Sequence, residues 1–176
     1  LISTSVSSND TTIGSLGSGP FQNDDYFIYD PLIDEEMVFF DDSALGDIDD
    51  ANAVHVFKNG HLAVSGGGTN TVDGSSSLPV AAAADIVFGA EDIVIYDPIL
   101  ETSTLFFDGS AIFTDPGGIY DAENIDALYI RENGNILFST AAPASIGATA
   151  FDEGDIVEYN PNLGTASILL DSEDAD

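Results

Sequence analysis

Aspartate and glutamate are the residues of this sequence whose number and clustering could support chemistry. The chain has 32 aspartates and glutamates against two lysines and arginines. Several acids fall at expected joints between loops and strands, where backbone carbonyls are also free, and calcium takes about six to eight oxygen ligands of this kind. The alternative is that these acids are simply solvated, since none of the clusters has EF-hand spacing. The candidate calcium ligands are Asp25, Asp92, Asp155, Asp152, Asp121 and Glu123.

Hydrolytic chemistry is less well supported by the sequence. Paired carboxylates serve glycosidases and aspartic proteases, but Asp108-Gly109-Ser110 is more simply a turn. The chain has no Gly-x-Ser-x-Gly elbow, P-loop or dinucleotide fingerprint. His55 and His61 flank one Asn59-Gly60 turn, and a zinc site would need more ligands. We therefore expect no enzyme, with a secreted hydrolase as the third hypothesis.

Aromatic side chains suggest a second kind of site, because tyrosine and phenylalanine rings stack on sugars in lectins. Most of them fall within expected strands and suit a core, so carbohydrate binding is an alternative hypothesis. The aromatic residues concerned are Tyr26, Phe27, Tyr29, Phe39, Phe40, Tyr96, Phe106, Phe107, Tyr120, Tyr129 and Tyr159.

The elements that would position these residues are repeated hairpins. After Asp92, residues 93–96 are β-branched and aromatic, Asp97-Pro98 ends that run, and a second apolar run covers 104–107. This pattern predicts strand, turn and strand. It recurs near both ends of the chain. Asp92 follows the equivalent Asp25 by 67 residues and precedes the equivalent Asp155 by 63. The pattern is an internal repeat.

A second repeated hairpin lies between these copies. Residues 52–65 align with residues 126–139 at a constant offset of 74. Asn59-Gly60 and Asn133-Gly134 fall at the centre of each, and Asn-Gly between apolar runs predicts a two-residue type I′ turn. Lys58 and Arg131, the two cations of the chain, occupy neighbouring positions in these hairpins. Each either meets an acidic surface, across a subunit contact for example, or is a plain exposed hairpin residue.

Composition limits the class of protein. The chain is 44% apolar, has no apolar run long enough for a membrane helix and lacks helical periodicity, which favours an ordered all-β protein without membrane insertion. A formal charge of −30 repels nucleic acid and anionic membranes, so we expect neither as a partner. It suits a saline setting or bound calcium, and also plain solubility. The absence of cysteine fits a secreted or cell-surface bacterial protein.

Domain organisation follows from the repeats. We expect one β-repeat domain over 1–176, in which residues 1–23 end a preceding repeat and its loop. Residues 24–90 form repeat 1, 91–153 form repeat 2, and 154–176 form a half repeat with an acidic tail. The predicted fold is all-β, with tandem four-stranded antiparallel repeats of two hairpins each. A propeller needs about four blades or more, so the chain either completes a ring with other copies or forms an open β-repeat assembly.

Three phrases of the repeat, GDIVEYNP, TSTLFFDGSA and NIDALYIRENGNILFST, resemble repeats of uncharacterised secreted proteins from marine and other Gram-negative bacteria. The resemblance covers most of the chain beyond Asn23. It implies a secreted, propeller-like β-repeat protein and implies no activity.

The functional hypothesis combines these observations. We expect an extracellular structural or adhesive protein that assembles with copies of itself into an oligomer or filament. Residues Leu1, Ile2, Ser3 and Thr4 match the last strand of a repeat, so they either pair within their own chain or complete a neighbour by edge-strand complementation. The alternative is a propeller module that binds calcium or carbohydrate.

Overall fold

The computed structural model describes residues 2–3, 26–30, 35–40, 46–47, 51–72, 86–100, 102–114 and 124–172, the first four ranges as backbone only. The described chain is built from β-strands, with one helical turn, α1 (Gly109–Ile112). The expected all-β fold with repeated antiparallel four-stranded sheets is therefore confirmed. Within these ranges, no helix is both long enough and apolar enough to cross a membrane.

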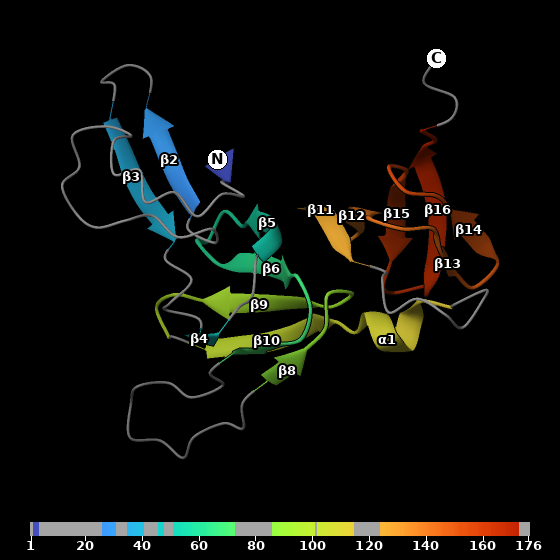
Figure 1. Ribbon diagram of the computed structural model, residues 1–176, viewed down its shortest axis with the longest axis horizontal. Helices are drawn as coiled ribbons and strands as arrows, with labels where there is room; N and C mark the ends of the chain where they lie inside the picture. Colours follow the sequence, from blue (N-terminus) through green and yellow to red (C-terminus); the bar gives the residue numbers. More distant parts are fainter. Residues whose placement is uncertain are drawn as a thin grey trace.

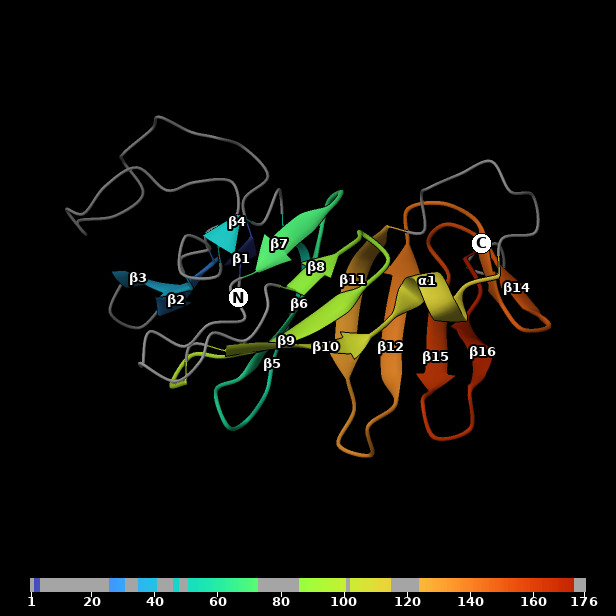
Figure 2. The same ribbon diagram turned by 90° about the horizontal axis from the view of Figure 1, so that it is seen from below.

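Two four-stranded antiparallel sheets form the centre and one end of the molecule (Figures 1 and 2). The first has the strand order β10-β9-β6-β5, and the second has the order β11-β12-β15-β16. The strands of the first are β5 (Ala51–Val56), β6 (Leu62–Gly66), β9 (Ile93–Asp97) and β10 (Thr102–Phe107). The strands of the second are β11 (Ile125–Ile130), β12 (Ile136–Thr140), β15 (Ile156–Asn160) and β16 (Thr165–Leu170).

A three-stranded sheet, β1-β2-β3, precedes them in the chain. Its strands are β1 (Ile2–Ser3), β2 (Tyr26–Asp30) and β3 (Glu35–Phe40). Ile2 pairs with Phe27, just as Val64 pairs with Val94 in the first four-stranded sheet and Phe138 pairs with Val157 in the second. The three-stranded sheet therefore repeats the last three strands of the other two, in the same register.

The sheets do not divide where the sequence repeats divide. Each four-stranded sheet joins an Asn-Gly hairpin to the Asp-Pro or Asn-Pro hairpin that follows it in the chain. The expected repeats 24–90 and 91–153 thus each end between the two hairpins of one four-stranded sheet. The segment expected to form a final half repeat completes the second sheet, and the sheet with three described strands is the first one in the chain.

Two small sheets fill out the repeats. One has the order β4-β7-β8, and the other pairs β13 with β14. Gly46 of β4 pairs with Val72, and the equivalent Phe113 forms an isolated bridge to Ile146. The repeat thus extends beyond the main hairpins. The bounds are β4 (Gly46–Asp47), β7 (Asn70–Val72), β8 (Ile86–Phe88), β13 (Ala144–Ile146) and β14 (Thr149–Phe151).

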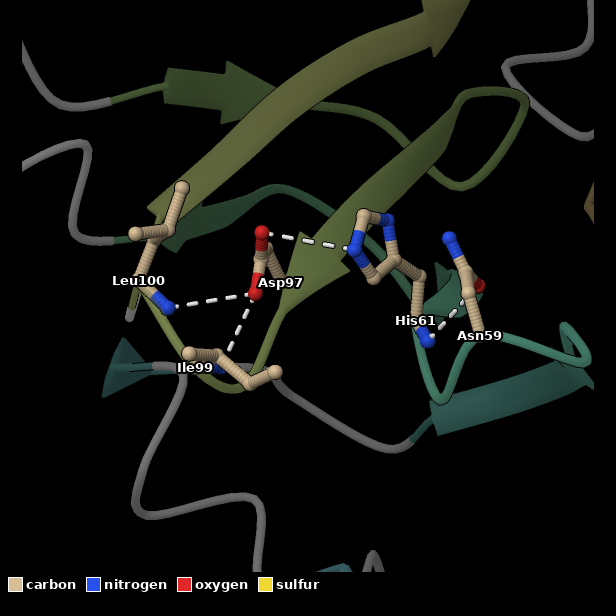
Figure 3. A network of polar contacts seen from close by, with 5 residues as sticks. All are labelled: Asn59, His61, Asp97, Ile99 and Leu100. Atoms are coloured by element: carbon tan, nitrogen blue, oxygen red, sulfur yellow. Dashed lines mark hydrogen bonds and ion pairs between the residues drawn. The ribbon is translucent and has the colours of Figure 1, made fainter.

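The turn after β9 shows why the Asp-Pro motif ends a strand. The Asp97 carboxylate accepts hydrogen bonds from the backbone N–H groups of Ile99 (2.9 Å) and Leu100 (3.1 Å), which closes the turn (Figure 3). Its other oxygen lies 3.3 Å from His61 Nε2, which ties the turn to the neighbouring hairpin. Proline has no N–H to continue the ladder. The predicted strand end is confirmed.

The Asn-Gly hairpins are confirmed, but the predicted two-residue type I′ turn is wrong. Phe57 N–H donates to the His61 carbonyl, and Gly60 N–H donates to the Phe57 carbonyl, both at 2.9 Å. These bonds define a three-residue loop in which Gly60, at φ +89°, takes the left-handed position after the turn. Asn59 accepts a bond from His61 N–H through Oδ1, as Figure 3 shows. The second hairpin repeats this arrangement, with Gly134 at φ +84°.

The main described core lies between the two four-stranded sheets and the small β13-β14 sheet. Its centre is a group of aromatic rings in which Phe107 lies 5.4 Å from Tyr159 and 6.0 Å from Phe138, between ring centroids. Phe113, which directly follows α1, and Phe151, which ends β14, extend the group. Aromatic pairs at this spacing add to the stabilisation from buried area, so the sheets are joined through their faces.

Candidate functional site

Successive repeats meet through equivalent residues. Strand β5 lies beside β11, and His55 contacts Tyr129 with ring centroids 5.0 Å apart. Lys58 forms an ion pair with Glu132 in the same row. Both pairs join residues 74 apart, which is the offset of the repeated hairpin. The hairpins therefore stack in register, as repeat units do in solenoids and propellers.

A groove of about 550 Å³ opens between the tips of the two Asn-Gly hairpins, and we call it the hairpin-tip groove. It is the site at which the two cations of the chain are brought together. Its lining residues are His55, Val56, Phe57, Lys58, Asn59, Tyr129, Ile130, Arg131 and Glu132.

The groove is locally neutral in a strongly acidic protein. Lys58 pairs with Glu132, and Arg131 Nε lies 3.6 Å from Glu158 Oε1. Burial lowers the pKa of the His55 imidazole, which keeps that ring neutral at pH 7. The Tyr129 side chain is 53% exposed at the groove wall. An exposed aromatic ring beside paired charges offers a stacking surface together with hydrogen-bonding groups.

The structure places one acid of the same chain beside each cation, Glu132 beside Lys58 and Glu158 beside Arg131. An acidic surface across a subunit contact stays a prediction. The Lys58 and Glu132 side chains are 89% and 82% exposed, so this pair contributes little to stability.

A second candidate site is the outward face of the last sheet. Four aliphatic residues of this sheet lie on that face, and we call them the open face: Ala127, Leu137, Ile156 and Leu170. Tyr129 and Glu158, both directly opposite Leu137, share the same side of the sheet. Their counterparts in the first sheet are Ala53, Ala63, Ile93 and Phe107, which are between 0% and 5% exposed because the second sheet covers them. In the last sheet Leu170 is 55% exposed, Ala127 is exposed, and Leu137 and Ile156 are half-buried.

Register accounts for this grouping. Ile156 pairs with Leu170 across β15 and β16, just as Ile93 pairs with Phe107 across β9 and β10. Residues directly opposite in an antiparallel pair project from the same face. A shallow cavity of about 180 Å³ lies on this face and includes Ala127, Leu137 and Ile156 among its lining residues. The four residues of the open face are thus apolar and lie at an indentation, with the charged Glu158 on the same side of the sheet.

Two of the candidate calcium ligands hold the backbone together. Asp92 accepts N–H bonds from Gly89 and Gly109, both at 2.8 Å. Asp155 accepts equivalent bonds from Asp152 (2.9 Å) and Ser172 (2.8 Å). Each carboxylate is buried. It joins the loop before its own strand to the second residue after the following strand. Backbone N–H groups aimed at a carboxylate oppose a cation at the same oxygens, so these residues act as structural clamps.

Calcium binding stays a prediction. Within the described ranges, no group of three or more acidic, histidine or cysteine side chains is placed to hold a metal. Asp152 is exposed and contributes its backbone N–H to the Asp155 clamp. Asp25, Asp121 and Glu123 lie outside the described residues.

The N-terminal strand pairs within its own chain. Ile2 and Ser3 pair with Phe27 and Tyr26, while Leu1 and Thr4 lie outside the described residues. This pairing is within one chain, and completion of a neighbouring copy by this strand stays a prediction. In its sheet, β1 is an edge strand, so its second edge has no strand partner among the described residues.

Sequence reasoning did not single out the open face. The signal was present in the alignment of the hairpins, where Leu137 replaces Ala63 and Leu170 replaces Phe107 at matching offsets. The alignment shows that these positions are apolar. It does not show which of them are exposed, because their burial depends on whether a second sheet packs against them. Comparison with known protein families and with curated proteins finds no match for this chain.

Proposed function

We propose that this chain is a structural module of an extracellular β-repeat protein and that its function is to assemble with copies of itself into an oligomer or filament. The observation that carries the proposal is the contrast between the open face and its buried counterparts. A Leu170 that is 55% exposed stands where Phe107 is 2% exposed. The fold thus covers this face once and presents it again at the end of the described chain.

Self-association would bury this surface. Covering a leucine side chain fully stabilises by about 1.5–3 kcal/mol, and the open face also offers Leu137 and Ile156. One edge of β1 has no strand partner among the described residues, and it adds a second means of joining copies, because an open strand edge accepts another strand. An acidic, cysteine-free surface is compatible with work outside the cell, in salt.

The test is the native mass of the 18.4 kDa chain, measured by light scattering over a range of concentrations. We expect masses at multiples of 18.4 kDa. Leu170→Asp should weaken association about 10-fold or more, since it places a charge in the contact.

The matched control is Leu163→Asp. Leu163 is 72% exposed in the turn between β15 and β16, away from the open face. This variant should associate like the unmodified chain. A chain that stays monomeric at all concentrations in high salt would refute the proposed function.

A second candidate function is the binding of neutral carbohydrate in the hairpin-tip groove. The observation that favours it is the exposed Tyr129 ring beside paired charges and the neutral His55. Neutral sugars fit better than anionic ones, because the protein carries −30 overall.

Calorimetry with neutral hexasaccharides of glucose and N-acetylglucosamine tests this candidate. Binding should be lost in Tyr129→Ala and retained in Tyr129→Phe, because phenylalanine keeps the stacking ring. If no hexasaccharide binds, or if Tyr129→Ala binds unchanged, the groove is no sugar site.

A further inference from the structure

We infer that the open face of one copy receives the three-stranded sheet β1-β2-β3 of a second copy, so that chains join head to tail. This inference rests on the proposed function, because it names the partner surface for the same self-association. The reason lies in what already covers the equivalent face inside the chain.

The first sheet shows what packs against the face that corresponds to the open face. Ala53, Ala63, Ile93 and Phe107 are buried by the second four-stranded sheet, whose β12 and β15 supply Phe138, Val157 and Tyr159 to the shared core. A surface complementary to the open face should therefore present apolar residues at the register positions of Phe138, Val157 and Tyr159.

The three-stranded sheet has apolar residues at those positions. Ile2 pairs with Phe27 as Phe138 pairs with Val157. Tyr29 pairs with Glu36 as Tyr159 pairs with Ala166. By register, Ile2, Phe27 and Tyr29 thus take the places of Phe138, Val157 and Tyr159.

The placement of the two sheets favours joining between copies over closure within one copy. Figure 1 shows β2 and β3 at one end of the long axis of the molecule and β15 and β16 at the other. A contact of this kind joins two different surfaces, so repeated addition produces a ring or a filament.

Cross-linking tests the pairing, and the absence of native cysteine makes it clean. Phe107 lies 5.4 Å from Tyr159 between ring centroids, and the matching pair between copies is Leu170 with Tyr29. Chains carrying Leu170→Cys are mixed with isotope-labelled chains carrying Tyr29→Cys and treated with a short bis-maleimide. We expect mixed dimers in at least fivefold excess over those formed when Leu163→Cys replaces Leu170→Cys.

A second pair guards against a folding defect in Tyr29→Cys. Phe107 lies 6.0 Å from Phe138, so Leu170→Cys should also cross-link to Ile2→Cys. Circular dichroism and light scattering first establish that each variant folds and associates like the unmodified chain. Association without a mixed-dimer excess for either pair overturns this inference and leaves the proposed function standing, whereas a strictly monomeric chain overturns both.

Discussion

The buried aspartates Asp92 and Asp155 show how a recurring acid can be structural. Each begins a strand and accepts two backbone N–H bonds, with matching partners at sequence separations of 3 and 17 residues in both repeats. Hydrogen bonds to a charged group contribute about 1.5–3 kcal/mol each. The acid at this position of each repeat therefore has a structural role, because it joins the hairpin to the loop that precedes it.

Substituting Asp155 should destabilise the fold and change its pH dependence. We expect Asp155→Asn to lower the free energy of unfolding by about 2 kcal/mol at pH 7, because the amide is a weaker acceptor and adds a competing donor. The N–H bonds from Ser172 and Asp152 hold the pKa of Asp155 below its usual value of 3.8. Its contribution is therefore fully present above about pH 4 and is lost as the pH falls through the lowered folded-state pKa.

Urea denaturation between pH 3 and pH 7 measures this effect. The gap between Asp155→Asn and the unmodified chain should narrow toward the acidic end. Asp152→Asn is the control, since this neighbouring side chain is exposed and the clamp uses only its backbone N–H, so it should be close to neutral. A gap that is constant over the whole pH range would contradict the clamp assignment.

At the scale of elements, the Asn-Gly hairpin is the unit that stacks. Its turn is a three-residue loop with a left-handed glycine, and the tips of successive hairpins form the hairpin-tip groove. The turn geometry places Lys58 and its counterpart position, Glu132, in the same row. The groove therefore depends on the turn conformation as much as on its lining residues.

Gly134 provides a test of that conformation. A Cβ added at Gly134 would meet no atom within 4 Å, but the backbone has φ +84°. Gly134→Ala should therefore cost about 1–2 kcal/mol of stability, purely from the left-handed conformation. Gly134→Asn should cost less, because asparagine tolerates this region better. Thermal unfolding of the two variants gives the comparison, and equal costs would argue against a conformational origin.

At the scale of the whole molecule, two opposing terms set assembly. Apolar burial at the open face favours contact between copies, while a charge of −30 on each chain opposes it. Salt screens the second term and leaves the first nearly intact. The mass measurement proposed above should therefore be carried out at seawater-like salt, where repulsion between copies is weakest.

Much of the architecture was predictable from the sequence. The spacing of Asp25, Asp92 and Asp155 predicts the repeat, and Asp97-Pro98 and Asn59-Gly60 predict where strands end. These features are local, because φ restrictions, missing donors and β-branched runs act over a few residues. The similarity of residues 1–4 to 137–140 also predicts the register that Ile2 adopts on β2.

The tertiary structure decided what local rules leave open. The sequence by itself determined the hairpins, while only the structure showed that each sheet joins an Asn-Gly hairpin to the hairpin after it. Likewise, Phe107 and Leu170 are equivalent in sequence, yet one is buried and the other exposed. The physical reason is that burial on a sheet face depends on which sheet packs against it, a contact between residues distant in the chain that no local pattern encodes.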